Sequence, residues 1–322
     1  MSVGTFTLDG LEIPGRAPMP RSEETPFVLC AFDSESNPVG GVVSDHSVAW
    51  AVGLGVLQPH EAADAVRMDL GHIVGYGYPS ADYDQLRLMG DCALLSTVLR
   101  DRAVPAEELA LLLAVLRAET TPPDDPRADA MAELRIRLLA LGGPEWLDGF
   151  AEAVAGMFDG FSRETVANRA GRVPTPEAHA AVREHTVGLY PMFLFAGPVE
   201  GLVLPPAVRS HAAILELTAT ACRIVGYARD LFTHREEIAR GCVHNLVLVT
   251  MREHAVLPDK AIDRAVSVHD DEVRHFVRTA AELPSFGSSD DAVVQEYVEL
   301  LRRWVGGHRK WAEYTGRYRR PD

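Results

Sequence analysis

Cationic side chains are scarce in this sequence, and lysine is nearly absent. The 322 residues include 31 Lys and Arg against 46 Asp and Glu, which gives a net charge of −15. Only Lys260 and Lys310 are lysines, so arginine supplies almost all of the positive charge. Binding of nucleic acid needs clustered cations that neutralise phosphates. We therefore expect no nucleic-acid partner.

Cysteine and long apolar runs are also rare. The four cysteines, at positions 30, 92, 222 and 242, form no CxxC pair, which argues against a disulfide framework or a zinc site. No stretch of about 18 apolar residues is present, so we expect no membrane span. The N-terminus has no basic segment followed by an apolar one, which is the pattern of a secretory signal. These observations predict a reduced, cytoplasmic protein.

Strand-type alternation and domain linkers are missing as well. Prolines at positions 14, 18, 20 and 26 interrupt residues 1–27, which we expect to be irregular. Residues 28–322 contain no Pro/Gly linker or internal repeat, and the best strand candidate, 199–204, is short. The pattern predicts an all-α, single-domain helical bundle, a fold that can enclose a cavity between its helices.

Helical segments follow one another through most of the chain. Gly142-Gly143-Pro144 is expected to stop one helix and begin another, while Gly226 and Gly241 interrupt the longest helical run. The expected helices cover residues 86–100, 107–118, 129–141, 144–168, 174–186, 211–255, 259–282 and 290–314.

A polar stripe runs along the helix expected over 211–255. Arg229, Thr233 and Glu237 are spaced i, i+4 and i+8, so they share one face of an otherwise apolar helix. From spacing alone, a solvent-exposed face is the simpler interpretation.

The same segment resembles the second metal motif of bacterial class I terpene synthases, Asn-Asp-x-x-Ser-x-x-x-Glu. On this pattern Asp230, Thr233 and Glu237 match, whereas Arg229 stands where the motif has its ligand Asn. The flanking residues Ala239-Arg240-Gly241 and Val243-His244-Asn245-Leu246 also match.

Three further fragments carry the resemblance over nearly the whole chain. Tyr78-Pro79-Ser80-Ala81-Asp82 is similar to the segment that precedes the first metal motif. Val173-Pro174 with Arg183 and Gly188 is similar to the segment that holds a diphosphate-sensing Arg. Trp311 to Tyr318 resembles the C-terminal ending of the family, in which an Arg-Tyr pair reaches the diphosphate. The resemblance implies the class I helical fold, Mg²⁺ as cofactor, diphosphate contacts from Arg183, Arg317 and Tyr318, and the possibility of a homodimer.

Both metal motifs depart from the family pattern. Counting forward from Tyr78-Pro79 places Arg100-Asp101 at the first motif, where the family has Asp-Asp. An arginine has no lone pair to offer Mg²⁺ and repels it, so only Asp101, Thr233 and Glu237 remain as candidate metal ligands. Arg100 and Arg229 are instead suited to bidentate contact with a diphosphate.

Three hypotheses follow. The first is cyclisation of a linear prenyl diphosphate, C15 or C20, through an allylic carbocation, with Arg100, Arg229, Arg183, Arg317 and Tyr318 around the diphosphate. The second is a cyclase or isomerase whose isoprenoid substrate has no diphosphate, with Asp101 or Glu237 as an acid of raised pKa. The third is a non-catalytic homologue that binds a hydrophobic ligand. The first is the function that we expect.

Overall fold

The computed structural model of the protein describes residues 5–8, 11–14, 28–30 and 32–318. Its elements are β1 (Thr5–Leu8), β2 (Leu11–Pro14), α1 (Gly40–Gly53), η1 (Pro59–Glu61), α2 (Ala62–Met68), α3 (Leu70–Gly77), α4 (Tyr83–Asp101), α5 (Ala106–Leu116), α6 (Pro126–Arg169), α7 (Pro176–Thr186), α8 (Leu189–Leu194), α9 (Ala196–Glu200), α10 (Pro206–Arg209), α11 (Ala212–Ala239), α12 (Leu246–His254), α13 (Pro258–Ala281), α14 (Ser288–Ala312) and η2 (Gly316–Tyr318).

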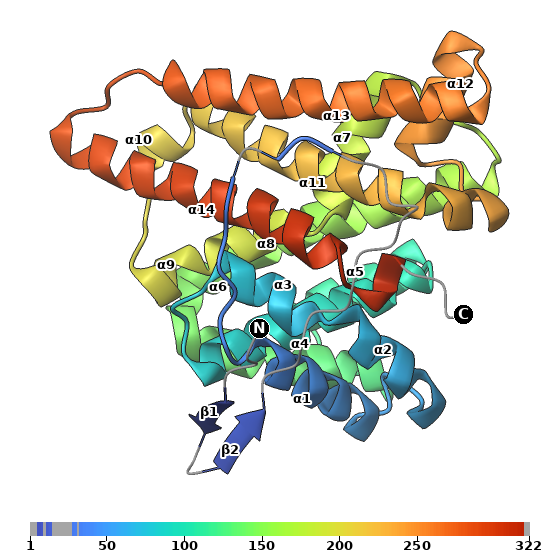
Figure 1. Ribbon diagram of the computed structural model, residues 1–322. Helices are drawn as coiled ribbons and strands as arrows, with labels where there is room; N and C mark the ends of the chain where they lie inside the picture. Colours follow the sequence, from blue (N-terminus) through green and yellow to red (C-terminus); the bar gives the residue numbers. More distant parts are fainter. Residues whose placement is uncertain (1–4, 9–10, 15–27, 31, 319–322) are drawn as a thin grey trace.

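The predicted all-α bundle is confirmed. Helix α11 lies between α13 and α14 and packs on both, and it also packs on α7 (Figure 1). Helices α1, α3, α4 and α6 form the other half of the bundle, with α14 packed on α3. One apolar core extends from Val43 on α1 to Trp311 on α14. None of the described helices combines the length and the apolar character that a membrane-spanning segment needs.

Helix α6 contains the break that the sequence predicts at Gly142-Gly143-Pro144. Gly143 has φ 75° and ψ 178°, a conformation that only glycine adopts easily, and Pro144 follows it. The chain therefore bends there but continues as helix on both sides. The second half of α6 carries Met157, Phe161 and Glu164 toward the centre of the bundle.

The long run over 211–255 ends at Gly241, as predicted, but Gly226 does not interrupt it. Gly226 lies inside α11, where a Cβ atom would stand 2.5 Å from Cγ of Arg183. Its role is to admit that side chain rather than to break the helix. Asn245 then begins α12 as an N-cap, since its side chain accepts the N–H of Val247 at 2.9 Å.

The strand candidate at 199–204 is not a strand, and the expectation of an irregular segment over residues 1–27 is wrong in part. Residues 199–204 are not a strand, because α9 reaches Glu200 and ends at Gly201 in the left-handed conformation. Within residues 1–27, which we expected to be irregular, β1 and β2 pair as a short antiparallel hairpin. The prolines at 18, 20 and 26 lie outside the described residues.

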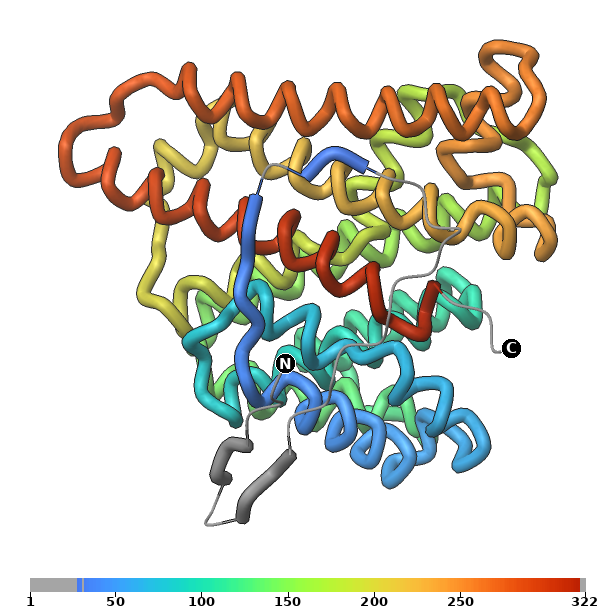
Figure 2. The backbone as a smooth tube through the Cα atoms, viewed as in Figure 1, coloured from blue at the N-terminus to red at the C-terminus, as the bar shows by residue number. Residues whose placement is uncertain are grey.

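The chain just before α1 crosses the outside of the bundle. Figure 2 shows the blue segment after residue 28 passing over α14 toward α1. Phe32 packs edge-on against Phe276 of α13, with the two ring centroids 5.4 Å apart. The backbone of Phe32 lies against Gly306 of α14. The segment therefore packs on the face of α14 that carries Gly306, whereas the cavity-lining residues Trp304 and His308 lie on another face of that helix.

Candidate functional site

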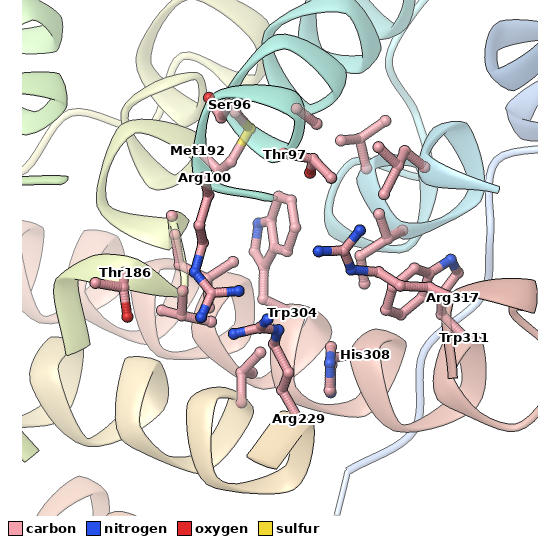
Figure 3. Close-up of a pocket in the computed structure, with 18 of the residues that line it drawn as sticks. Ser96, Thr97, Arg100, Thr186, Met192, Arg229, Trp304, His308, Trp311 and Arg317 are labelled. Atoms are coloured by element: carbon pink, nitrogen blue, oxygen red, sulfur yellow. The ribbon is translucent and has the colours of Figure 1, made fainter. Parts of the chain in front are cut away.

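A mostly apolar cavity lies at the centre of the bundle. Figure 3 shows its three arginines, Arg100, Arg229 and Arg317, directed toward the same part of it, with Trp304 forming a wall. The residues that line it are Leu70, Ile73, Val74, Ala93, Ser96, Thr97, Arg100, Met157, Phe161, Thr186, Val187, Gly188, Leu189, Met192, Val225, Arg229, Trp304, His308, Trp311, Arg317 and Tyr318.

A second, polar cavity adjoins the first. It is larger, about 330 Å³ against about 120 Å³, and Arg229 and Arg317 line both. The other residues around it are Asp64, Arg67, Met68, Asp101, Thr233, Glu236, Glu237, Arg240 and Gly316. Two arginines therefore stand where an apolar cavity meets a charged one, which is the arrangement that an amphiphilic ligand with an anionic head requires.

Helix α4 positions Arg100 and Asp101 in its last turn. Arg100 makes a bidentate ion pair with Glu164 of α6, with Nη2 to Oε1 at 2.7 Å and Nε to Oε2 at 3.2 Å. Burial lowers the pKa of the Arg100 guanidinium, but the carboxylates of Glu164, Glu237 and Asp101 outweigh burial and raise it. Arg100 is therefore a permanent positive charge in the cavity wall.

Helix α11 carries Arg229, Thr233 and Glu237 on one face, as the spacing predicts. The face is not solvent-exposed, because Thr233 and Glu237 are buried and Arg229 is only 12% exposed. Arg229 Nη2 lies 3.1 Å from Glu237 Oε1, and Asn245 donates to Glu237 Oε2 at 2.9 Å. Nη1 of Arg229 is buried and has no hydrogen-bond partner among the described residues. The hydroxyl of Thr233 donates to the carbonyl of Arg229 at 2.9 Å.

The C-terminal segment brings Arg317 and Tyr318 to the same place. Arg317 makes two bonds to Asp101, at 2.9 and 2.7 Å, and this pairing lowers the pKa of Asp101 although burial alone would raise it. Tyr318 packs on Phe232 and Trp311, and its hydroxyl lies 3.1 Å from Nε2 of His308.

Contacts with α2 fix the path of this segment. Thr315 donates to the carbonyl of Met68 at 2.7 Å, and a Cβ at Gly316 would lie 2.6 Å from Cβ of Arg67. Gly316 therefore allows the close approach that holds Arg317 over the cavities.

We expected Arg183 to contact a diphosphate, but it lies away from both cavities. It is fully buried and lines neither cavity. Its Nη2 lies 2.8 Å from Asp230 and donates to the carbonyl of His244 at 2.5 Å, while Nη1 donates to Thr186 at 3.2 Å. In this structure Arg183 holds α7 to α11, and its contact with a diphosphate stays a prediction.

Asp230 is the buried carboxyl group beside Arg183. It lies 2.9 Å from His179 and accepts the N–H of Leu246 at 3.0 Å. Burial raises the pKa of Asp230 to about 8, against the opposing effect of Arg183. Because Asp230 lines neither cavity, we assign it to the support of the site and not to contact with a ligand.

The candidate metal ligands do not fit an Mg²⁺ site. Mg²⁺ needs several free oxygen ligands in near-octahedral geometry. Asp101 is engaged by Arg317, Glu237 by Arg229 and Asn245, and the Thr233 hydroxyl by a backbone carbonyl. Across residues 28–30 and 32–318, no three His, Cys, Asp or Glu side chains are grouped so that they could hold a metal ion.

Sequence reasoning missed Glu164, the partner of Arg100. A signal was available, because Met157, Phe161 and Glu164 are spaced i, i+4 and i+7 and so share one face of a helix. A carboxylate on the apolar face of a helix needs a cation beside it, and Arg100 is that cation. His308 was also missed, although it follows Trp304, an aromatic candidate for the cavity wall, by four residues and so shares its face of α14.

Comparison with known proteins agrees with this geometry. Residues 100–275, more than half of the chain, match the family described as terpene synthase family 2, C-terminal metal binding. A (+)-T-muurolol synthase, (2E,6E)-farnesyl diphosphate cyclizing, from Roseiflexus castenholzii is 28% identical over 300 residues, which are 89% of this chain and 91% of the relative. A 10-epi-cubebol synthase from Sorangium cellulosum is 28% identical over 312 residues, 92% and 98% of the two chains.

Solved structures show the same fold. The crystal structure of an α-eudesmol synthase superposes with a TM-score of 0.78 over 89% of this chain and 98% of that chain, at 18% identity. The matched region begins at Arg100 and includes Arg183, Arg229 and Glu237. The chain belongs to terpene synthase family 2 and is a terpene cyclase-like enzyme with the class I helical fold.

Proposed function

We propose that this protein converts a linear C15 prenyl diphosphate to a cyclic terpene through an allylic carbocation. The observation that carries the proposal is the apolar cavity with Arg100, Arg229 and Arg317 at one end (Figure 3). An amphiphile with an apolar chain and an anionic head matches both parts of that site. The name of the relative from Roseiflexus castenholzii specifies cyclization of (2E,6E)-farnesyl diphosphate, which is a C15 prenyl diphosphate.

The reaction begins with heterolysis of the bond between C1 of the prenyl chain and the diphosphate oxygen. Both electrons leave with the diphosphate, and guanidinium groups stabilise that charge because they offer planar pairs of N–H donors to its oxygens. The remaining allylic cation is attacked by a double bond of its own chain, which closes the ring. Loss of a proton then gives a cyclic alkene, diphosphate and H⁺.

The cavity walls protect and stabilise the cation. Trp304 is a buried wall residue, and an indole face attracts a cation within about 6 Å. Phe161 and Trp311 add aromatic surface to the same cavity. Leu70, Ile73 and Leu189 exclude water, which would otherwise capture the cation.

The hypothesis of acid-initiated chemistry on a neutral substrate receives less support. It needs Asp101 or Glu237 as an acid of raised pKa. The pKa of Asp101 is instead lowered, because Arg317 pairs with it, and Glu237 is held by Arg229 and Asn245. Neither carboxyl is placed to donate a proton in the apolar cavity.

Incubation with geranyl, farnesyl and geranylgeranyl diphosphate tests the proposal. We expect a cyclic C15 product from farnesyl diphosphate, detected by gas chromatography–mass spectrometry of the extracts. Trp304→Leu should alter the product distribution while the fold stays intact, because it removes the indole face from the wall. Absence of any cyclic product from all three substrates, with and without Mg²⁺, would contradict the proposal.

A further inference from the structure

We propose that Arg100 and Arg229 bind the diphosphate group directly, without an Mg²⁺ cluster, by exchanging their resident partners Glu164 and Glu237 for diphosphate oxygens. This inference rests on the proposed function, because it takes a diphosphate as the anionic head of the substrate. It assigns a role to the two residues that break the metal motifs and to Glu164, which no motif includes.

The first argument is that Arg229 and Arg100 have N–H donors that their ion pairs do not use. Nη1 of Arg229 is buried without a hydrogen-bond partner in the described part of the chain, at the end of the apolar cavity. A buried donor that stays unpaired is unfavourable, and an anion seated there would satisfy it. Arg100 uses Nε and Nη2 for Glu164, and no bond from its Nη1 to a described residue is formed. Both guanidinium groups therefore keep a donor free for a ligand.

The second argument is charge balance. Arg100, Arg229 and Arg317 are matched one to one by Glu164, Glu237 and Asp101. A neutral cluster does not attract Mg²⁺, and its carboxylates are already occupied. The free donors give a diphosphate its first contacts, and it balances its own charge in such a cluster by also taking over donors that the carboxylates now hold. A single ligand with several charged oxygens can replace two separate carboxylates at once.

The third argument is that each displaced carboxylate already has a second partner. Oε1 of Glu164 lies 2.7 Å from Arg100 and 3.8 Å from Nη1 of Arg183, so Glu164 can pass from one guanidinium to the other. Glu237 keeps its bond from Asn245 and lines the polar cavity, where Arg240 also stands. The exchange therefore leaves no carboxylate buried without a partner, which would be strongly unfavourable.

Inorganic diphosphate tests the exchange by isothermal titration calorimetry in EDTA. Wild-type protein should bind it without metal. Glu237→Gln should bind it about tenfold more tightly, because the competitor of Arg229 loses its charge, and Arg229→Gln should bind it at least tenfold more weakly. A metal cluster predicts the opposite for Glu237→Gln, since loss of a ligand carboxylate weakens binding.

Glu216→Gln and Arg223→Gln are matched controls on the same helix. Glu216 and Arg223 form an ion pair at 2.7 Å near the other end of α11 and line neither cavity. Both control variants should bind diphosphate as the wild type does. Thermal unfolding of every variant shows which ones retain the fold. If Glu237→Gln is unstable, Glu164→Gln provides a second test, because it should also bind diphosphate more tightly than the wild type.

The outcomes separate this inference from the proposed function. Diphosphate binding that requires Mg²⁺, or that weakens in Glu237→Gln, would overturn the exchange while prenyl cyclisation could still be found. Metal-free binding with the expected signs, but without turnover of any prenyl diphosphate, would support the exchange and contradict the proposed cyclase activity.

Discussion

At the scale of single residues, two arginines change the chemistry of the site. The sequence alignment predicts that Arg100 and Arg229 stand where the family pattern has oxygen ligands, and in the structure each forms an ion pair with a carboxylate. A guanidinium is always charged and offers only donors, so these two side chains can bind an anion but cannot ligate Mg²⁺. The tertiary partners, Glu164 and Glu237, keep the site neutral until a ligand enters.

Reversal of both substitutions should create affinity for Mg²⁺. In Arg100→Asp combined with Arg229→Asn, Glu164 and Glu237 lose their cationic partners, and two further oxygen-bearing side chains enter the site. We expect Mg²⁺ binding at least tenfold tighter than in the wild type, measured by isothermal titration calorimetry. Arg223→Asn, a change outside both cavities, should show no gain. An unchanged Mg²⁺ affinity in the double variant would mean that the loss of two ligand side chains is not the main difference between this site and the metal-binding pattern of the family.

At the scale of helices, the site is assembled from elements that are far apart in the chain. Helix α4 supplies Arg100, α6 supplies Glu164, α11 supplies Arg229, and η2 supplies Arg317. The position of α11 relative to α7 depends on a close contact, because Arg183 passes directly over Gly226. The same Arg183 holds Asp230 on α11 and lies near Glu164 on α6.

Gly226→Ala should loosen this junction. The added Cβ would lie 2.5 and 2.8 Å from Cγ and Cδ of Arg183, whose guanidinium is fixed by Asp230, His244 and Thr186. We expect the free energy of unfolding to fall by about 1–3 kcal/mol, measured by urea denaturation. Gly149→Ala is the control, because its Cβ meets nothing within 4 Å and α6 should gain up to about 1 kcal/mol. Equal stability changes in the two variants would contradict the packing argument.

At the scale of the whole molecule, the C-terminal segment closes the bundle. Arg317 reaches Asp101 across 216 positions of sequence, and Thr315 reaches Met68 across 247. The same segment places Tyr318 against His308 in the cavity wall. Burial, with smaller contributions from His269 and Arg309, lowers the pKa of His308 to about 3. His308 is therefore neutral in the folded protein at pH 7.

Acid should destabilise the protein through this histidine. The pKa of His308 in the folded state lies below its ordinary value of 6.5, so its contribution is present above pH 6.5 and is lost as the pH falls from there toward 3. The share of His308 in the loss between pH 7 and pH 5 should be about 2 kcal/mol, in addition to the shares of His179 and His244, whose pKa values burial also lowers. Denaturant unfolding at both pH values measures it. His308→Gln should reduce the difference, whereas His254→Gln, which changes an exposed histidine on α12, should leave it as in the wild type.

The helical class and the ends of the long helices could be predicted from the sequence alone. Spacing of apolar residues placed α4, α5, α7, α13 and α14 close to their observed bounds, because helical periodicity is a local property. Gly143-Pro144 and Gly241 interrupt a helix through their own backbone conformation, which does not depend on distant residues. The helix breaks at these positions could therefore be predicted as well. The shared face of Arg229, Thr233 and Glu237 followed from the same periodicity.

The ion-pair partner of each charged residue in the site depends on how the folded chain brings distant segments together. Glu164 is 64 positions from Arg100, and Asp101 is 216 from Arg317, so no local pattern relates them. Ion pairing depends on distance in space and on burial, and neither can be obtained from sequence spacing. For the same reason, Arg183 had the sequence context of a diphosphate contact but lies fully buried between Asp230 and His244.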